Sequence, residues 1–292
     1  MPPNERRYVL TLGCPDRTGI VARIASFLAE RGGWIIEAGY HTDPDTGWFF
    51  TRQEVRADSL PFGVDELRER FAEVADQLDE RTEWHVSDTG RRRRVVILVS
   101  KEGHCLHDLL GRVGSGELDV DLRAVIGNHP HLGPITEAHG IPFHHVPFPS
   151  SKDPQGKQDA FARIGELVEA QDPDAIVLAR FMQVLPPELC RAWQGRALNI
   201  HHSFLPSFAG ARPYHQAYQR GVKLVGATCH YVTADLDAGP IIEQDVTRVD
   251  HTDSVPDMVR KGRDIEKIVL ARGLRAHVED RVLVHDQRTV IF

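Results

Sequence analysis

The chain has 292 residues, and its balance of 41% apolar to 26% charged residues is typical of a folded protein with about two domains. Its net charge of -7 argues against nucleic acid as a partner, because contacts with phosphates need a basic footprint. No apolar run reaches the ~18 residues that a membrane span requires, and the four cysteines lack CxxC spacing, so we expect a cytoplasmic chain with reduced thiols.

The first 88 residues alternate between strand-like and helix-like segments. Alternating or β-rich runs predict strands, and apolar residues at helical spacing predict helices. The predicted strands are Arg7–Cys14, Trp34–His41, Trp48–Val55 and Thr82–Val86, and the predicted helices are Ile20–Arg31 and Pro61–Leu78. The order βαββαβ is the ferredoxin-like pattern, so we expect residues 1–88 to form a first α/β domain.

A polar stretch that contains a glycine, Ser87–Arg93, is the predicted linker to a second domain at 89–292. That domain begins with the apolar run Arg94–Ser100, as expected of a strand with helices over both faces. Helix-like and strand-like segments then alternate at Cys105–Val113, Val120–Ile126, Pro134–His139, Phe143–Val146, Lys152–Ala170, Ala175–Leu178, Glu188–Trp193 and Ala197–His201. An antiparallel strand pair and a long helix are expected at Val225–Val232, Pro240–Val249 and Ser254–Glu279. This alternation predicts a mostly parallel, Rossmann-like sheet.

Two polar side chains end the strand that is expected at Ala197–His201. Asn199 and His201 lie two positions apart, so they point to the same face of the strand. Ligands of an open α/β sheet lie beyond the carboxyl ends of its strands, and there an amide and an imidazole would share one crevice. Taken alone, such a pair is more typical of two hydrogen-bonded groups that merely end a strand.

The surrounding stretch, NIHHSFLPSFAGARPYHQAYQRGVKLVGATCHYVTADLDAGPII, resembles the core signature of the formyltetrahydrofolate-dependent formyltransferase family. In that family an Asn-x-His strand end is followed by a proline-glycine loop and later by an acidic loop reading Asp-x-Gly-Pro. The acidic loop here is Thr233–Pro240, and its Asp237 follows Asn199 by 38 positions (237 minus 199). The resemblance makes Asn199, His201 and Asp237 the catalytic set.

The chemistry of formyl removal accounts for these three residue types. Attack on the formyl carbon gives a tetrahedral oxyanion, to which Asn199 would donate a hydrogen bond. His201 would stabilise the same oxygen and pass a proton to the leaving nitrogen. Asp237 would hold the charged imidazole by its opposite charge and position the attacking water. Asp235 is a rival carboxylate, but the spacing before Gly239 favours Asp237.

The folate site is expected at Ile176–Leu185, which resembles the family's segment that lines the pterin pocket. Without the resemblance, this strand and apolar loop would be read as core. The resemblance assigns substrate binding to Arg180, Met182, Val184, Leu185, Thr233 and Gly239. Because the reduced folate is itself the substrate, no cofactor is expected.

The turn after the first strand of the second domain indicates which molecule accepts the formyl group. Family members that make purine precursors carry Gly-Ser/Thr-Asn there, and its backbone amides hold the acceptor's phosphate. Here Glu102, His104 and Cys105 take those places, so we expect water as the acceptor. The patterns SKxxHCLxDLL at 100–110, GIPFHH at 140–145 and GARPYHQAY at 210–218 resemble the formyltetrahydrofolate deformylases.

That subfamily places an ACT domain before the catalytic domain, which matches the βαββαβ unit at the front of the chain. The resemblance therefore implies hydrolysis of 10-formyltetrahydrofolate to tetrahydrofolate and formate, which would supply purine synthesis and balance one-carbon pools. A glycine or methionine effector is a possibility, although Gly33–His41 lacks the asparagine and glutamine expected there. ACT edge strands favour a homo-oligomer.

Two alternatives stay open at this point. One is a formyltransferase that moves the formyl group to an amine acceptor, and another is a non-catalytic regulator that binds an amino acid. A metal enzyme is disfavoured, because the neighbouring residues of His144–His145 and His201–His202 point to opposite faces of a strand and make poor chelates.

Overall fold

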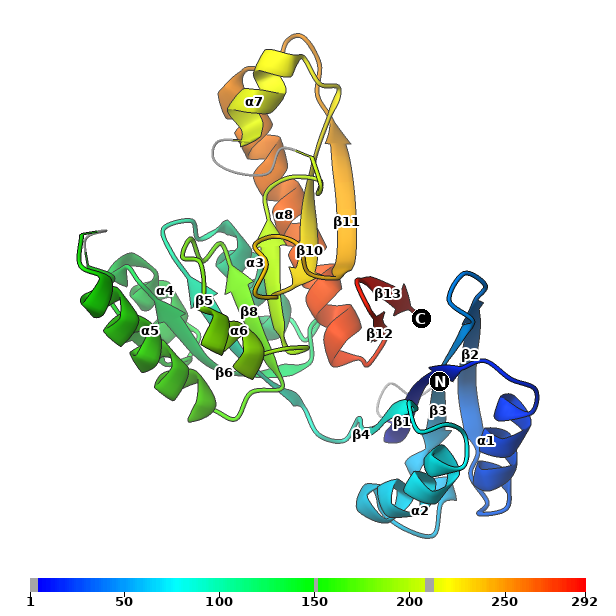
Figure 1. Ribbon diagram of the computed structural model, residues 1–292. Helices are drawn as coiled ribbons and strands as arrows, with labels where there is room; N and C mark the ends of the chain where they lie inside the picture. Colours follow the sequence, from blue (N-terminus) through cyan, green and yellow to red (C-terminus); the bar gives the residue numbers. More distant parts are fainter. Residues whose placement is uncertain (1–4, 150–151, 208–212) are drawn as a thin grey trace. The chain divides into compact units, whose positions relative to one another are not determined.

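The computed structural model describes residues 5–149, 152–207 and 213–292 (Figure 1). They form two compact units. The first extends to Arg92 and takes in Asp280–His285 and Val290–Phe292, and the second comprises Arg93–Glu279 and Asp286–Thr289. Among the described residues, none of the helices combines the length and the apolar character needed to cross a bilayer.

The first unit contains the predicted βαββαβ arrangement. Its elements are β1 (Arg7–Pro15), α1 (Ile20–Ala29), β2 (Ile35–Asp43), β3 (Trp48–Arg56), the 3-10 turn η1 (Ala57–Ser59), α2 (Val64–Asp76) and β4 (Glu83–Asp88). The four strands form an antiparallel sheet in the order β2-β3-β1-β4. The ferredoxin-like topology predicted from the sequence is therefore confirmed.

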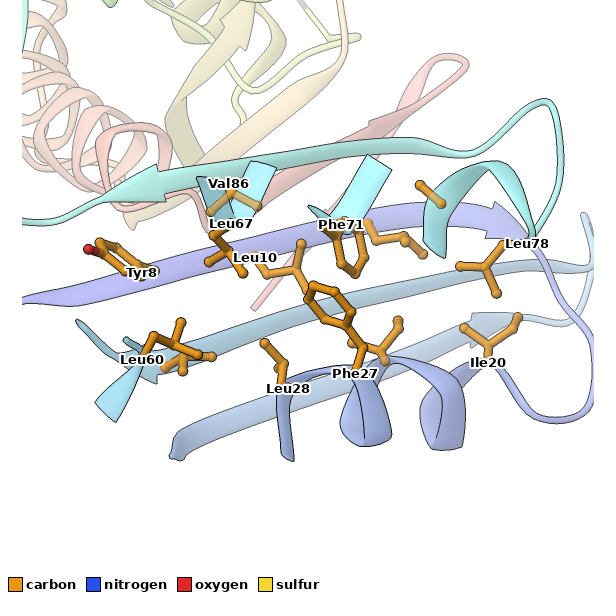
Figure 2. Close-up of a cluster of buried hydrophobic side chains, with 14 of the residues drawn as sticks. Tyr8, Leu10, Ile20, Phe27, Leu28, Leu60, Leu67, Phe71, Leu78 and Val86 are labelled. Atoms are coloured by element: carbon orange, nitrogen blue, oxygen red, sulfur yellow. The ribbon is translucent and has the colours of Figure 1, made fainter. Parts of the chain in front are cut away.

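Both helices of this unit pack their apolar stripes on one face of the sheet. Figure 2 shows Phe27 and Leu28 of α1 and Leu67 and Phe71 of α2 turned toward the same interior as Leu10 of β1. The rings of Phe27 and Phe71 meet edge to face, with centroids 5.5 Å apart, a favoured aromatic geometry. The helical spacing of these residues in the sequence is thus the cause of the helix–sheet contact.

The last residues of the chain return to the sheet of the first unit. Short strands β12 (Val282–His285) and β13 (Arg288–Ile291) pair with each other. The ring of His285 stacks on Trp48 at 4.4 Å, and Ser87 donates a hydrogen bond to Asp280. The Phe292 ring lies so close to Gly39 that a side chain there would meet it at 2.5 Å. This hairpin was not predicted from the sequence.

The second unit is an α/β sandwich around a seven-stranded sheet. Its elements are β5 (Arg93–Val99), α3 (His104–Gly114), β6 (Val120–Gly127), η2 (Pro130–Leu132), α4 (Gly133–Ala138), β7 (Phe143–His145), α5 (Pro154–Glu169), β8 (Ala175–Ala179), α6 (Pro187–Ala192), β9 (Ala197–His201), α7 (Pro213–Arg220), β10 (Leu224–Tyr231), β11 (Ile241–Arg248) and α8 (Val255–Val278). The strand order is β11-β10-β9-β8-β5-β6-β7, parallel from β9 to β7 and antiparallel at β10 and β11. The predicted mostly parallel sheet is confirmed.

Helices cover both faces of this sheet. Val96 and Leu98 of β5 pack with Ile164 of α5 on one face, whereas α3 and α8 lie on the other. Figure 1 shows α8 running beside β10 and β11. The close approach depends on Gly273, where a side chain would meet the Cys229 sulfur of β10 at 2.5 Å. The continuous apolar run of β5 in the sequence reflects this double coverage.

The sheet reverses its direction of growth between β5 and β8. From β5 the chain builds β6 and β7 toward one edge, then returns to place β8 and β9 on the other side of β5. The carboxyl ends of β5 and β8 therefore flank a topological switch point, where open α/β sheets bind their ligands. The sequence did not predict α7, and residues 208–212 of the family's proline-glycine loop lie outside the described residues.

Candidate active site

A cavity of about 430 Å³ opens beyond the carboxyl ends of β8 and β9. It is lined by nearly all the residues that the sequence singled out: Arg180, Met182, Val184, Leu185, Asn199, His201, Thr233 and Asp237. Gly239 is not among the lining residues. It lies just behind the acidic loop, where an added side chain would meet the backbone oxygen of Tyr231 at 1.8 Å. Only glycine therefore lets the loop approach β10 so closely.

An imidazole and a carboxylate form an ion pair at one end of this cavity. His201, the last residue of β9, is 5% exposed, and its Nε2 atom lies 3.2 Å from Oδ2 of Asp237. Asp237 belongs to the loop between β10 and β11 and has a left-handed backbone, with φ of 54°. Aspartate tolerates that conformation better than most residues. The hydrogen bond from His201 holds the pKa of Asp237 below its ordinary value, so the carboxylate is charged.

The other nitrogen of His201 is held by Ser203. The Ser203 hydroxyl donates to the backbone oxygen of Ser207 at 2.8 Å, which uses its one hydrogen. Its oxygen therefore accepts from Nδ1 of His201, 3.0 Å away. The Nε2 atom faces the carboxylate of Asp237, so each ring nitrogen of His201 has a polar partner that fixes the orientation of the ring.

Asn199 is oriented by a histidine that the sequence did not single out. Asn199 of β9 lies opposite His230 of β10 in the strand pairing, and its Nδ2 atom is 3.2 Å from Nε2 of His230. The Nδ1 atom of His230 donates to the backbone oxygen of Tyr231 at 2.9 Å, so Nε2 is the accepting nitrogen. Burial lowers the pKa of His230, which keeps the ring neutral. One amide hydrogen of Asn199 is thus fixed, and the other is free to serve a ligand in the cavity.

Much of the remaining lining of this cavity is apolar, and we call this apolar part the slot. Leu185 is buried in it, whereas Met182, Val184 and Leu236 at its rim are 56%, 58% and 68% exposed. Large apolar side chains exposed together are uncommon on a protein surface and mark binding sites. A flat, mainly apolar ring system suits this slot.

The rival carboxylate of the acidic loop also lines the cavity. Asp235 is exposed, and its backbone oxygen accepts a hydrogen bond from the Thr233 hydroxyl at 3.0 Å. The carboxylate that pairs with His201 is that of Asp237.

One group of side chains has metal-ligand chemistry but does not suit a metal. Ligand atoms of His104, Cys105 and Glu266 lie within 4.8 Å of one another. The Glu266 carboxylate already accepts a hydrogen bond from His104 at 2.8 Å and faces the Arg180 cation at 3.4 Å. Burial raises the pKa of the Cys105 thiol well above its ordinary value, which disfavours the thiolate that a metal needs.

Comparisons with known proteins show which proteins this chain resembles. The family model described as Formyl transferase matches residues 93–274. A formyltetrahydrofolate deformylase of Bacillus subtilis is 46% identical over 290 residues, which is 99% of this chain and 95% of that protein. The crystal structure of a formyltetrahydrofolate deformylase from Pseudomonas syringae pv. tomato is 56% identical, with a TM-score of 0.96 over 100% of this chain and 96% of the other.

The resemblance to transferases is narrower. The crystal structure of glycinamide ribonucleotide transformylase 1 from Symbiobacterium toebii is 28% identical, with a TM-score of 0.65. The matched region is 96% of the transformylase chain but 70% of this chain. The deformylases, by contrast, match the first unit as well as the second. The chain therefore belongs to the formyl transferase family and, within it, to the formyltetrahydrofolate deformylases.

Proposed function

We propose that this chain hydrolyses 10-formyltetrahydrofolate to tetrahydrofolate and formate, with Asn199, His201 and Asp237 as the catalytic residues. One observation carries the proposal. An amide, an imidazole and a carboxylate meet at the end of an apolar cavity of about 430 Å³. A folate has the matching shape, because its flat pterin ring is followed by the formyl-bearing nitrogen N10.

The pterin ring is assigned to the apolar slot. Met182, Val184 and Leu185 would contact its faces, and Thr233 would offer a hydroxyl at the edge. Gly239 would act indirectly, because it lets the acidic loop lie against β10 and so sets the position of Asp237. In this placement N10 and its formyl group lie between Asn199 and the His201–Asp237 pair.

Hydrolysis begins with attack of a water oxygen on the formyl carbon. The Asp237 carboxylate orients the water, and a water proton passes to the Asp237–His201 pair. The formyl oxygen becomes the oxyanion, which receives a hydrogen bond from the free amide hydrogen of Asn199 and is stabilised electrostatically by the imidazole, which the proton of the water leaves charged. Fixing these groups before the reaction is the main contribution of the protein, because no reorganisation is then needed in the transition state.

The intermediate collapses when a proton reaches N10. The pair of His201 and Asp237 returns a proton to this nitrogen, the carbon–N10 bond breaks, and tetrahydrofolate departs as the neutral amine. Formic acid remains and ionises to formate. Each proton is accounted for by water and by this one pair, so no metal or nucleotide enters the sequence of steps.

The direct test is formate release from 10-formyltetrahydrofolate by the purified chain, with no metal or nucleotide added. Equal amounts of formate and tetrahydrofolate are expected. The proposal is wrong if a folded chain converts the substrate without releasing formate, or does not convert it at all.

We also propose a division of labour along the chain. Residues 1–88 would form a regulatory domain of the ACT type, and residues 89–292 the catalytic domain, joined by a linker at about 87–93. An amino-acid effector and a homo-oligomer are part of this proposal. Formate release measured with and without glycine and methionine tests the regulatory part, and identical rates under all three conditions would contradict those two effectors.

A further inference from the structure

A buried group of charged and polar side chains fills the crevice between the carboxyl ends of β5 and β8. Its centre is Glu266 of α8, which is 1% exposed. Its Oε2 atom lies 2.8 Å from Nε2 of His104 and 3.4 Å from Nε of Arg180. Its Oε1 atom accepts a hydrogen bond from the Tyr214 hydroxyl at 2.8 Å. We call these four residues the Glu266 cluster.

Several features of the fold maintain this cluster at an energetic cost. Burial alone would raise the pKa of Glu266, yet the hydrogen bond from His104 and the charge of Arg180 keep it below its ordinary value. Arg180 has a left-handed backbone, with φ of 62°, which is strained for a residue with a side chain. Gly262 makes the room for Tyr214, because a side chain there would lie 1.9 Å from the hydroxyl. Buried charges and local strain in one place are typical of a functional site.

The cluster occupies the place where an open α/β sheet receives a ligand. Arg180 follows β8 and His104 opens the helix after β5, so the two flank the topological switch point. Arg180 also lines the catalytic cavity, whereas His104 lines two hollows on the surface beyond it. Glu266 bridges these two residues. The cluster therefore separates the catalytic cavity from the hollows.

The same catalytic fold serves a transformylase named for glycinamide ribonucleotide. Transfer to an amine and hydrolysis share their first stage, in which a nucleophile adds to the formyl carbon. In transfer, a bond forms between the amine nitrogen and that carbon, the carbon–N10 bond breaks, and the amine's proton replaces the formyl group on N10. In hydrolysis, water takes the place of the amine. The outcome depends on which nucleophile can reach the carbon.

We infer that the Glu266 cluster determines the acceptor, by closing the switch-point side of the catalytic cavity to amines while water enters freely. This inference rests on the proposed function. Water needs no more room than the cavity already offers beside Asp237. An amine carries substituents, and these would have to occupy the space that the Arg180 side chain and its partner Glu266 fill.

The test is a partition experiment with 10-formyltetrahydrofolate and glycinamide, a small primary amine. The double variant Arg180→Gly, Glu266→Gln opens the space, relieves the strain at φ of 62° and leaves no unpaired buried carboxylate. N-formylglycinamide and formate are both quantified, and their ratio does not depend on the overall rate. The ratio in the double variant is expected to exceed that of the wild type by ~10-fold or more.

Two further variants make the result decisive. Arg272→Gln removes an exposed arginine of the same helix, which pairs with Asp245 outside the cluster, and should keep the wild-type ratio. His104→Ala removes the outermost member of the cluster and should raise the ratio less than the double variant does; it also replaces the double variant if that chain does not fold. Wild-type ratios in every folded cluster variant would overturn the inference. Absence of formate release by the wild type would instead overturn the proposed function.

Discussion

The side-chain amide of Asn199 donates to Nε2 of His230 across the β9–β10 pairing, at 3.2 Å. The rest of the His230 ring is fixed as well, because Nδ1 donates to the backbone oxygen of Tyr231. Rotating a side-chain amide by half a turn exchanges the positions of its oxygen and its nitrogen. Because Nε2 of His230 is an acceptor, only the orientation that places the Asn199 nitrogen beside it forms a hydrogen bond. We therefore expect His230 to act as a positioning residue, which would keep a donor rather than an acceptor directed at the formyl oxygen of the proposed substrate.

Replacement of His230 by leucine should lower kcat with little change in KM. The leucine offers no acceptor, so the Asn199 amide loses its fixed orientation and the oxyanion loses a donor, a loss that costs ~10²-fold in comparable sites. His230→Gln, which supplies a side-chain oxygen as acceptor, should recover part of kcat. Steady-state kinetics of both variants check this. Equal kcat in His230→Leu and the wild type would contradict the positioning role.

Replacement of Asp237 by asparagine should lower kcat by ~10² or more, because the His201 imidazole loses its counter-ion and the water loses its acceptor. Asparagine also tolerates the left-handed backbone at this position, with φ of 54°, so the fold should be kept. Asp235→Asn is the matched control in the same loop and should stay near the wild-type rate. If Asp235→Asn is the damaging change, the catalytic carboxylate has been misassigned.

The candidate site residues were chosen from local pattern. Alternation along β9 predicted that Asn199 and His201 share a face, and both line the cavity. The Gly239–Pro240 spacing favoured Asp237 over Asp235, and both of these line the cavity as well. Each of these features is contained in a short stretch with a clear period or turn. The strands of both sheets, in their order along the chain, were predictable for the same reason.

Features that depend on distant pairing were not predictable. His230 lies on a predicted strand, but its place opposite Asn199 follows from a strand register that one sequence does not reveal. Glu266 is one of many charged residues of a long helix, and only the packing of α8 shows that it is 1% exposed. The C-terminal strands β12 and β13 are four residues each, too short to display a period.

Gly239→Ala should lower both the stability of the second unit and the rate of formate release. The new methyl group would meet the Tyr231 backbone oxygen at 1.8 Å, so the loop that carries Asp237 must move away from β10. A forced backbone shift of this kind costs ~2 kcal/mol or more of unfolding free energy. Gly111→Ala is the control in the same unit, because its methyl group would meet nothing within 4 Å. Denaturant unfolding of both variants gives the comparison, and equal stabilities would contradict the close approach.

His202 should make the fold less stable in mild acid. Burial and the nearby charge of Arg180 lower the pKa of this histidine from 6.5 to about 4. The unfolded chain then binds a proton below about pH 6.5 that the folded chain does not bind until about pH 4. Stability is thus fully present above pH 6.5 and decreases as the pH falls toward 4, by a total on the order of 3 kcal/mol for this one group.

The variant His202→Gln isolates that contribution, because glutamine does not titrate while His230 and Asp237 remain in place. The free energy of unfolding, measured by denaturant between pH 7 and pH 4.5, should fall less steeply in the variant than in the wild type. At pH 7 the folded and unfolded His202 are both neutral, so its protonation contributes little to the difference in unfolding free energy between variant and wild type. That difference should change mainly as the pH falls below 6.5. Parallel curves would show that His202 is as accessible to protons in the folded chain as in the unfolded one.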